Sequence, residues 1–171
     1  MDILVVVDMQ TGFIDGSLGT EEARRIVPEV VKKIQTFDGT VFATRDTHEE
    51  NYLETAEGKK LPVRHCIRGT EGWQIRQEIS DLLTEAPVDK VTFVSRELVK
   101  KLEQIQEETS IESITLIGLC TDICVIPNAM LCKAFLPEVP VQVDASCCAG
   151  VTVESHMQAL EAMKMCQIDS F

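Results

Sequence analysis

Short apolar runs alternate along the chain with longer segments that have a helical hydrophobic period. Ile3–Val7 is continuously apolar, which is typical of a strand covered on both faces. Glu21–Phe37 repeats its apolar residues at three- and four-residue spacing, which predicts a helix with one buried face. Similar apolar runs predict strands at Thr40–Thr44, Lys90–Val94, Ser113–Leu119 and Val139–Asp144. Periodic segments predict helices at Trp73–Leu83, Arg96–Glu108, Ile123–Phe135 and Thr152–Met165, and residues 45–72 predict a polar, irregular loop.

This order of elements predicts the fold class. Strands that alternate with helices form a parallel sheet with right-handed crossovers and helices on both faces. We therefore expect a doubly wound, mostly parallel, Rossmann-like three-layer α/β/α fold, with residues 1–171 as a single domain. Ligands in such folds bind beyond the carboxyl ends of the strands. The residues that follow each strand are therefore the first candidates for chemistry.

The composition narrows the class of partner. The chain has 28 acidic and 16 basic residues and a formal net charge of −12, which counts against nucleic acid because phosphates require clustered Lys and Arg. No apolar run approaches the roughly 20 residues of a membrane-spanning helix, and Ile3–Val7 reads as a strand rather than a signal peptide. The seven cysteines are an odd number without a CxxC pair, which favours free thiols in a reducing cytoplasm.

Three residues with catalytic chemistry lie next to predicted strands. Asp8 directly follows the first strand, a position that also suits a loop aspartate bonded to backbone. Cys124 falls in the first turn of a helix, where free N–H groups favour a thiolate and could hold an oxyanion; a buried structural cysteine is the alternative. Thr121 or Asp122 would cap that helix. Lys90 could lower the pKa of a nearby thiol, although spacing alone does not select it from 16 basic residues.

A second group of residues has the composition of a metal site. Asp46 and His48 are two positions apart, so they point to one side of extended backbone. His65 follows in the same long loop, and Glu57 between them could add a fourth ligand. Such donors suit zinc, manganese or iron, whereas solvated polar loop residues are the alternative. The remaining histidine, His156, lies in the last predicted helix and is expected to be a surface or packing residue.

Five short segments occur in the order found in a known family. They are Val5–Phe13, Thr44–His48, Leu61–Cys66, Lys90–Phe93 and Gly118–Val125. With these segments the chain resembles the isochorismatase-like cysteine hydrolases, and among them the nicotinamidase-type amidohydrolases, over essentially its whole length.

The resemblance implies roles for the residues at the strand ends. It implies a catalytic triad of Asp8, Lys90 and Cys124, and an oxyanion hole built from the N–H groups of Cys120 and Cys124. It also implies a cis peptide bond between Leu119 and Cys120.

The same resemblance implies a metal and a substrate pocket. Asp46, His48 and His65 match divalent-metal ligands, with zinc expected first and manganese or iron as alternatives. Phe13 matches an aromatic residue of the substrate pocket. Some nicotinamidases carry a tryptophan three residues before the second histidine, where this chain has Pro62, so the substrate need not be nicotinamide itself.

We therefore expect a cytoplasmic enzyme that cleaves a small carboxamide to an acid and ammonia through an acyl-thioester. The resemblance to nicotinamidases implies a place in pyridine nucleotide metabolism. The resemblance also implies a homo-oligomer. Two alternatives remain open: hydrolysis of another small amide, such as a carbamoyl or ureido compound, and a non-catalytic module on the same fold that binds a small molecule or a metal.

Overall fold

The computed structural model describes residues 1–171 and is built on a six-stranded sheet in which all neighbouring strands are parallel. The strands are β1 (Asp2–Val7), β2 (Thr40–Asp46), β3 (Val88–Lys90), β4 (Ser113–Leu119), β5 (Val141–Ala149) and β6 (Asp169–Ser170). Their spatial order is β3-β2-β1-β4-β5-β6. The order reverses at β1, so the carboxyl ends of β1, β2 and β4 meet at the point where such sheets bind ligands.

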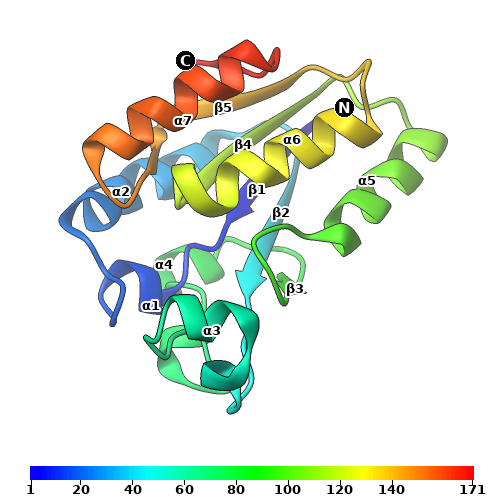
Figure 1. The fold of residues 1–171 in the computed structure, drawn as a ribbon. Coiled ribbons are helices and arrows are strands. Elements are labelled where there is room, and N and C mark those ends of the chain that lie inside the picture. The colour runs from blue at the N-terminus through cyan, green and yellow to red at the C-terminus, as the bar shows by residue number, and fades with distance from the viewer.

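Helices cover both faces of this sheet, as the sequence predicts. The longer helices are α2 (Glu21–Thr36), α5 (Arg96–Glu108), α6 (Ile126–Phe135) and α7 (Val153–Met165). Helix α2 packs on one face, and α5, α6 and α7 pack on the other (Figure 1). The short helices α1 (Thr11–Ile14), α3 (Ala56–Lys60) and α4 (Gln77–Ser80) gather beyond the carboxyl ends of β1 and β2 (Figure 1). None of the helices combines the length and the apolar composition that crossing a bilayer requires.

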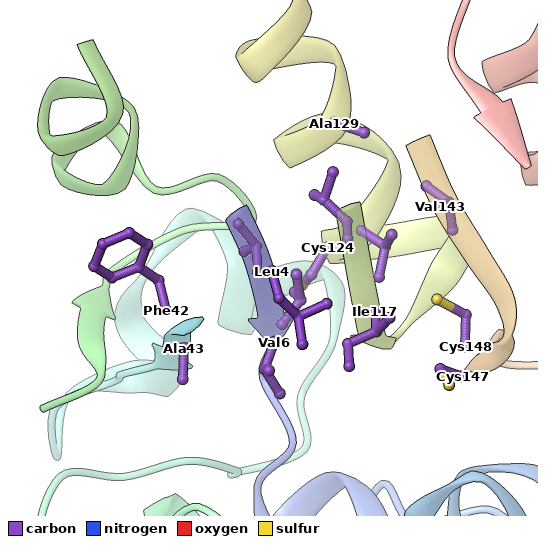
Figure 2. Packing of buried hydrophobic residues seen from close by; sticks show 14 of the residues in the cluster. Leu4, Val6, Phe42, Ala43, Ile117, Cys124, Ala129, Val143, Cys147 and Cys148 are labelled. Carbon is purple, nitrogen blue, oxygen red and sulfur yellow. The ribbon is translucent and has the colours of Figure 1, made fainter. Parts of the chain in front are cut away.

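The centre of the sheet is a rigid platform. Every residue of Ile3–Val7 is fully buried, and each such aliphatic side chain contributes about 1.5–3 kcal/mol on burial. Figure 2 shows Leu4 and Val6 of β1 beside Ile117 of β4, and Val143 on the adjoining strand β5. The residues that leave the ends of these strands are therefore fixed at their backbone by the core.

The strand predicted at Lys90–Val94 lies elsewhere. Strand β3 runs from Val88 to Lys90 and ends where the prediction begins. The apolar residues that prompted the prediction are not in a sheet: Val91 is 75% exposed and Phe93 is 44% exposed. Lys90 therefore stands at the carboxyl end of its strand, beside the other candidate residues.

The helix predicted at Trp73–Leu83 is mostly absent. A 3-10 turn covers Glu71–Trp73, and only Gln77–Ser80 forms an α-helix. Contacts with distant residues override the helical pattern, because the Trp73 Nε1–H donates to Thr47 Oγ1 and the guanidinium of Arg45 stacks on the indole.

Candidate active site

Asp8, Lys90 and Cys124 meet at the carboxyl edge of the sheet. Lys90 Nζ lies 2.6 Å from Asp8 Oδ2 and 3.6 Å from Cys124 Sγ. Thr44 fixes the other carboxylate oxygen, since its hydroxyl donates to Asp8 Oδ1 at 2.7 Å. All of these side chains are buried. The ammonium group thus links the carboxylate and the thiol that the sequence analysis selected separately.

Burial is the largest single influence on the pKa values of Asp8, Cys124 and Lys90. Burial raises the pKa of Asp8 above its ordinary value, and the opposing effect of Lys90 is smaller. Burial and the Asp8 carboxylate likewise raise the pKa of the Cys124 thiol well above its usual range, against the effect of Lys90. The expectation of a lowered thiol pKa is therefore wrong for the net shift, although Lys90 itself acts in the expected direction. Burial alone would lower the pKa of Lys90, but its interactions with Asp8, Cys124 and Asp46 outweigh burial, and the pKa is raised.

Cys124 belongs to a tight turn between β4 and α6. Thr121–Val125 form one π-helical turn, and the carbonyl of Cys120 accepts hydrogen bonds from the N–H groups of Ile123, Cys124 and Val125 at 3.0–3.1 Å. The Cys124 N–H is therefore already engaged, contrary to the expectation of a free donor at that position. The N–H of Cys120 donates no hydrogen bond within the chain. The bond between Leu119 and Cys120 is cis, as the resemblance implies.

The two residues expected to cap this helix bond to another element instead. No side chain caps the turn. Thr121 is fully buried, and its Oγ1 lies 2.8 Å from Nδ1 of His156 on α7. The carboxylate of Asp122 accepts a hydrogen bond from the N–H of Val151, just before α7. His156, expected to be a surface or packing residue, is half-buried and hydrogen-bonded.

The metal-type residues form a second cluster next to the first. Asp46 Oδ2 lies 2.9 Å from His48 Nε2 and 3.7 Å from His65 Nε2. Glu57 Oε1 lies 3.5 Å and 3.8 Å from the same two nitrogens. Lys90 joins the clusters, since its Nζ is 3.1 Å from Asp46 Oδ1.

The donors of this cluster fit a divalent ion. Four ligands at the usual zinc distances stand about 3.4 Å apart in a tetrahedron, and the separations between the two carboxylates and the two imidazoles bracket that value. His48 Nε2 is buried and makes no well-directed hydrogen bond although Asp46 Oδ2 is 2.9 Å away, which a coordinating nitrogen would explain. Nδ1 of His65 lies 2.7 Å from the Val63 carbonyl, a contact that presents Nε2 as the free ligand atom. Burial lowers the pKa of His48, but Asp46 outweighs it and the net pKa is raised.

Two supporting residues of these clusters escaped the sequence analysis. Gln10 is fully buried and holds the Asp46 backbone on both sides: its Oε1 accepts from the Asp46 N–H, and its Nε2 donates to the Asp46 carbonyl. Its position two residues after Asp8 at the strand end could have identified it. Tyr52 is fully buried with its ring centroid 4.6 Å from that of His48 and 4.9 Å from that of His65. Only the folding of the long loop brings it there.

Asn128 is a third supporting residue that the sequence analysis missed. It is fully buried on α6, one helical turn after Cys124, and its amide donates to the carbonyls of Cys124 and Phe93. Its Oδ1 accepts from the N–H of Ser95. Asn128 therefore fastens the segment after Lys90 to the turn that carries the thiol.

A small cavity of about 60 Å³ opens onto both clusters. Five of its lining residues are apolar: Phe13, Leu18, Leu61, Phe93 and Ile123. The other five are polar or ionisable: Asp46, Glu57, His65, Cys120 and Cys124. The structure thus brings Phe13 to the place that the resemblance implies. Pro62 is exposed and lies outside this lining, so the aromatic surface comes from Phe13 and Phe93.

This geometry can be compared with known proteins. A model of the isochorismatase domain family matches residues 2–169. The chain belongs to the isochorismatase family. This membership confirms the resemblance seen in the sequence segments, and the fold agrees with it.

Individual relatives of the family are distant. The chain is 26% identical to a nicotinamidase of Acinetobacter baylyi over 156 residues, 74% of this chain and 72% of that protein. The structure is similar to that of a pyrazinamidase of Pyrococcus horikoshii in complex with zinc, with a TM-score of 0.82, 27% identity and coverage of 99% and 98% of the two chains. It is also similar to N-carbamoylsarcosine amidase of Thermoplasma acidophilum, with a TM-score of 0.75, 25% identity and coverage of 99% and 95%.

Proposed function

We propose that the protein hydrolyses a small, neutral carboxamide to an acid and ammonia, with Cys124 as nucleophile, Asp8 as general acid and base, and Lys90 as the cation between them. The observation that carries this proposal is the contact of one buried ammonium with both the Asp8 carboxylate and the Cys124 sulfur. Membership of the isochorismatase family and the likeness to a nicotinamidase and a pyrazinamidase support the reaction class.

The reaction begins with the attack of Cys124 on the substrate, which leads to an acyl group on the sulfur. Asp8 takes the Sγ proton as the sulfur attacks the amide carbonyl. The raised pKa of Asp8 suits this step, since it makes the carboxylate a better base. Lys90 stabilises the developing thiolate, and the free N–H of Cys120 is the leading donor to the oxyanion. The N–H of Cys124 would share its existing hydrogen bond with that oxygen.

The tetrahedral intermediate gives an acyl-enzyme, and hydrolysis of that acyl-enzyme regenerates the free thiol. The tetrahedral intermediate collapses, the C–N bond breaks, and Asp8 returns its proton to the nitrogen so that ammonia leaves. The product at this stage is a thioester between the acyl group and Cys124. Asp8, again ionised, takes a proton from water as the water oxygen attacks the thioester. The C–S bond then breaks, the acid is released, and the proton returns to the sulfur.

A divalent ion, with zinc expected first, would be held by Asp46, His48 and His65, with Glu57 as a fourth ligand. When bound, such an ion would act as a Lewis acid and would orient a ring nitrogen of the substrate or a water molecule. The protein itself orients these ligands through Gln10, which holds Asp46, and through the carbonyl of Val63, which bonds His65.

The walls of the cavity favour a neutral substrate with an apolar, flat acyl group. Phe13 and Phe93 offer aromatic surface, and no arginine or lysine is among the lining residues. A substrate carboxylate would therefore find no cationic side chain in the lining to pair with. Nicotinamide and pyrazinamide have the required chemistry. A carbamoyl amino acid fits less well, although the likeness to N-carbamoylsarcosine amidase keeps carbamoyl compounds as the second candidate.

Ammonia release tests the proposal. The panel would contain nicotinamide, pyrazinamide, an aliphatic amide and an N-carbamoyl amino acid, each with added zinc and with chelator. We expect turnover of the neutral aromatic amides, abolished in Cys124→Ala and retained in Cys132→Ala, which removes another buried cysteine away from the cavity. Near-native turnover by Cys124→Ala would contradict the nucleophile, and turnover of the carbamoyl compound alone would select the second candidate.

A further inference from the structure

One histidine lies outside both clusters but is bonded to the turn that precedes the nucleophile. His156 is in the first turn and a half of α7, and its Nδ1 lies 2.8 Å from Oγ1 of the fully buried Thr121. Thr121 directly follows Cys120, whose free N–H is the leading oxyanion donor of the proposed reaction. His156 therefore contacts the residue next to Cys120 but is not among the residues that line the cavity.

The surroundings of His156 are built closely around it. A side chain at Gly150 would place its Cβ only 2.8 Å from the His156 backbone nitrogen, so the chain before α7 passes directly against this helix. Asp122 adds a parallel connection through the N–H of Val151. Two consecutive residues of the turn, Thr121 and Asp122, are thus anchored to the start of α7 rather than to their own helix.

The imidazole is suited to accept the hydrogen bond. Burial lowers the pKa of His156, and the nearby Asp122 carboxylate only partly opposes this effect. Glu22 and Arg25 of α2 share with His156 the lining of an open cavity of about 190 Å³. Neutral His156 can accept at Nδ1 a hydrogen bond that the Thr121 hydroxyl donates, which fixes the buried hydroxyl and the backbone that carries it.

We propose that His156 is a positioning residue that, through Thr121, holds the Cys120 N–H where the oxyanion of the acyl-transfer reaction forms. This inference rests on the proposed function for its purpose, but its test does not require turnover. It predicts that reactions forming an oxyanion at Cys124 depend on His156, whereas reactions of the same sulfur without an oxyanion do not.

Two nearly isosteric variants separate these cases. His156→Leu removes the polar partner, and His156→Asn keeps a polar atom near the position of Nδ1. Pyridine-3-carbaldehyde serves as the oxyanion probe: Asp8 takes the thiol proton, the Cys124 sulfur bonds to the carbonyl carbon, and the carbonyl π electrons move to oxygen, which then carries the negative charge. Iodoacetamide serves as the control, since the sulfur displaces iodide and no oxyanion forms. Peptide mass mapping assigns the alkylated product to Cys124, and protection of Cys124 from iodoacetamide by the aldehyde measures the reversible adduct.

We expect His156→Leu to weaken the aldehyde adduct about tenfold, the effect of losing one hydrogen bond, and to lower kcat for amide hydrolysis by a similar factor with KM within about twofold. Alkylation by iodoacetamide should stay at the wild-type rate, and His156→Asn should recover most of the loss. An unchanged adduct in His156→Leu, or an equal fall in adduct formation and alkylation, would overturn the positioning role. A wild-type enzyme that forms the adduct with this dependence but hydrolyses no amide would overturn only the proposed function. No adduct in the wild type would overturn both.

Discussion

Two pairs of lysine and aspartate in this molecule have opposite character, and one is partly exposed whereas the other is fully buried. On the face covered by α2, Lys33 Nζ lies 2.9 Å from Asp144 Oδ2 of β5, and Ser146 donates two hydrogen bonds to the other carboxylate oxygen. Burial alone would raise the pKa of Asp144, but these partners lower it below its ordinary value. One cation meets one carboxylate, and every charge has its partners.

At the ligand edge of the sheet the charges do not balance in this way. One ammonium, Lys90, faces the two carboxylates of Asp8 and Asp46 together with the Cys124 thiol. The pKa of Asp8 is raised, whereas that of Asp144 is lowered. The same residue types therefore stabilise the fold at Lys33 and Asp144, whereas at Lys90 and Asp8 they leave a carboxylate with a raised pKa, as a general base requires.

The largest expected effect comes from removing the shared cation. Lys90→Met should lower the free energy of unfolding at neutral pH by about 3–5 kcal/mol, because two buried carboxylates lose their only ammonium. Lys33→Met should cost only about 1 kcal/mol, since that pair is partly exposed. Urea denaturation measures both. Equal losses in the two variants would contradict the difference between the pairs.

Asp8→Asn should separate activity from stability. Because the pKa of Asp8 is raised in the folded protein, its ionised form costs stability above the unfolded-state pKa, and an uncharged residue removes this cost. We expect amide hydrolysis to fall about 1,000-fold, with the free energy of unfolding changed by no more than about 1 kcal/mol, since the lost ion pair with Lys90 opposes this gain. Retained turnover would show that another group acts as the base.

Glu57→Gln tests whether Glu57 is a fourth ligand of the metal cluster. If Glu57 is a ligand, zinc affinity should fall about tenfold, measured by competition with a chromophoric chelator. Glu50→Gln is the matched control, since Glu50 lies in the same loop but pairs with Arg64 at the surface. Identical affinities in the two variants would leave three ligands, Asp46, His48 and His65.

The smallest effect concerns the balanced pair. Asp144→Asn should lower the free energy of unfolding by about 1 kcal/mol at neutral pH. The folded-state pKa of Asp144 lies below its ordinary value of 3.8, so the wild-type advantage is present above pH 3.8 and disappears as the pH falls through the folded-state value. Denaturation at several pH values checks this, and an advantage that persists in strong acid would refute it.

The sequence predicted the parts of the site that depend on strand ends. Asp8 directly follows β1 and Asp46 is the last residue of β2, so the sheet itself places them, and His48 follows Asp46 at the strand spacing. The fold class and the order of layers were predictable for the same reason, because the apolar runs that mark the strands are long and continuous.

Other parts depended on contacts that no local pattern contains. Tyr52 and Asn128 reach the site through loop folding and helix packing. The apolar residues near Phe93 predicted a strand because a pocket wall and a strand share the same composition; in the structure they border the cavity and solvent. The raised pKa of Cys124 was missed because helix position favoured an anion, whereas complete burial outweighed it.

The most direct test of the central claim is an acid-quench experiment with the carboxamide that turns over fastest. Rapid mixing followed by peptide mass mapping should reveal an acyl group on Cys124 in the wild type. None should appear on Cys132, and none on Cys124 in Asp8→Asn. Ammonia release in a burst with no acyl group on Cys124, or acyl groups spread over several cysteines, would contradict a reaction through the Asp8, Lys90 and Cys124 cluster.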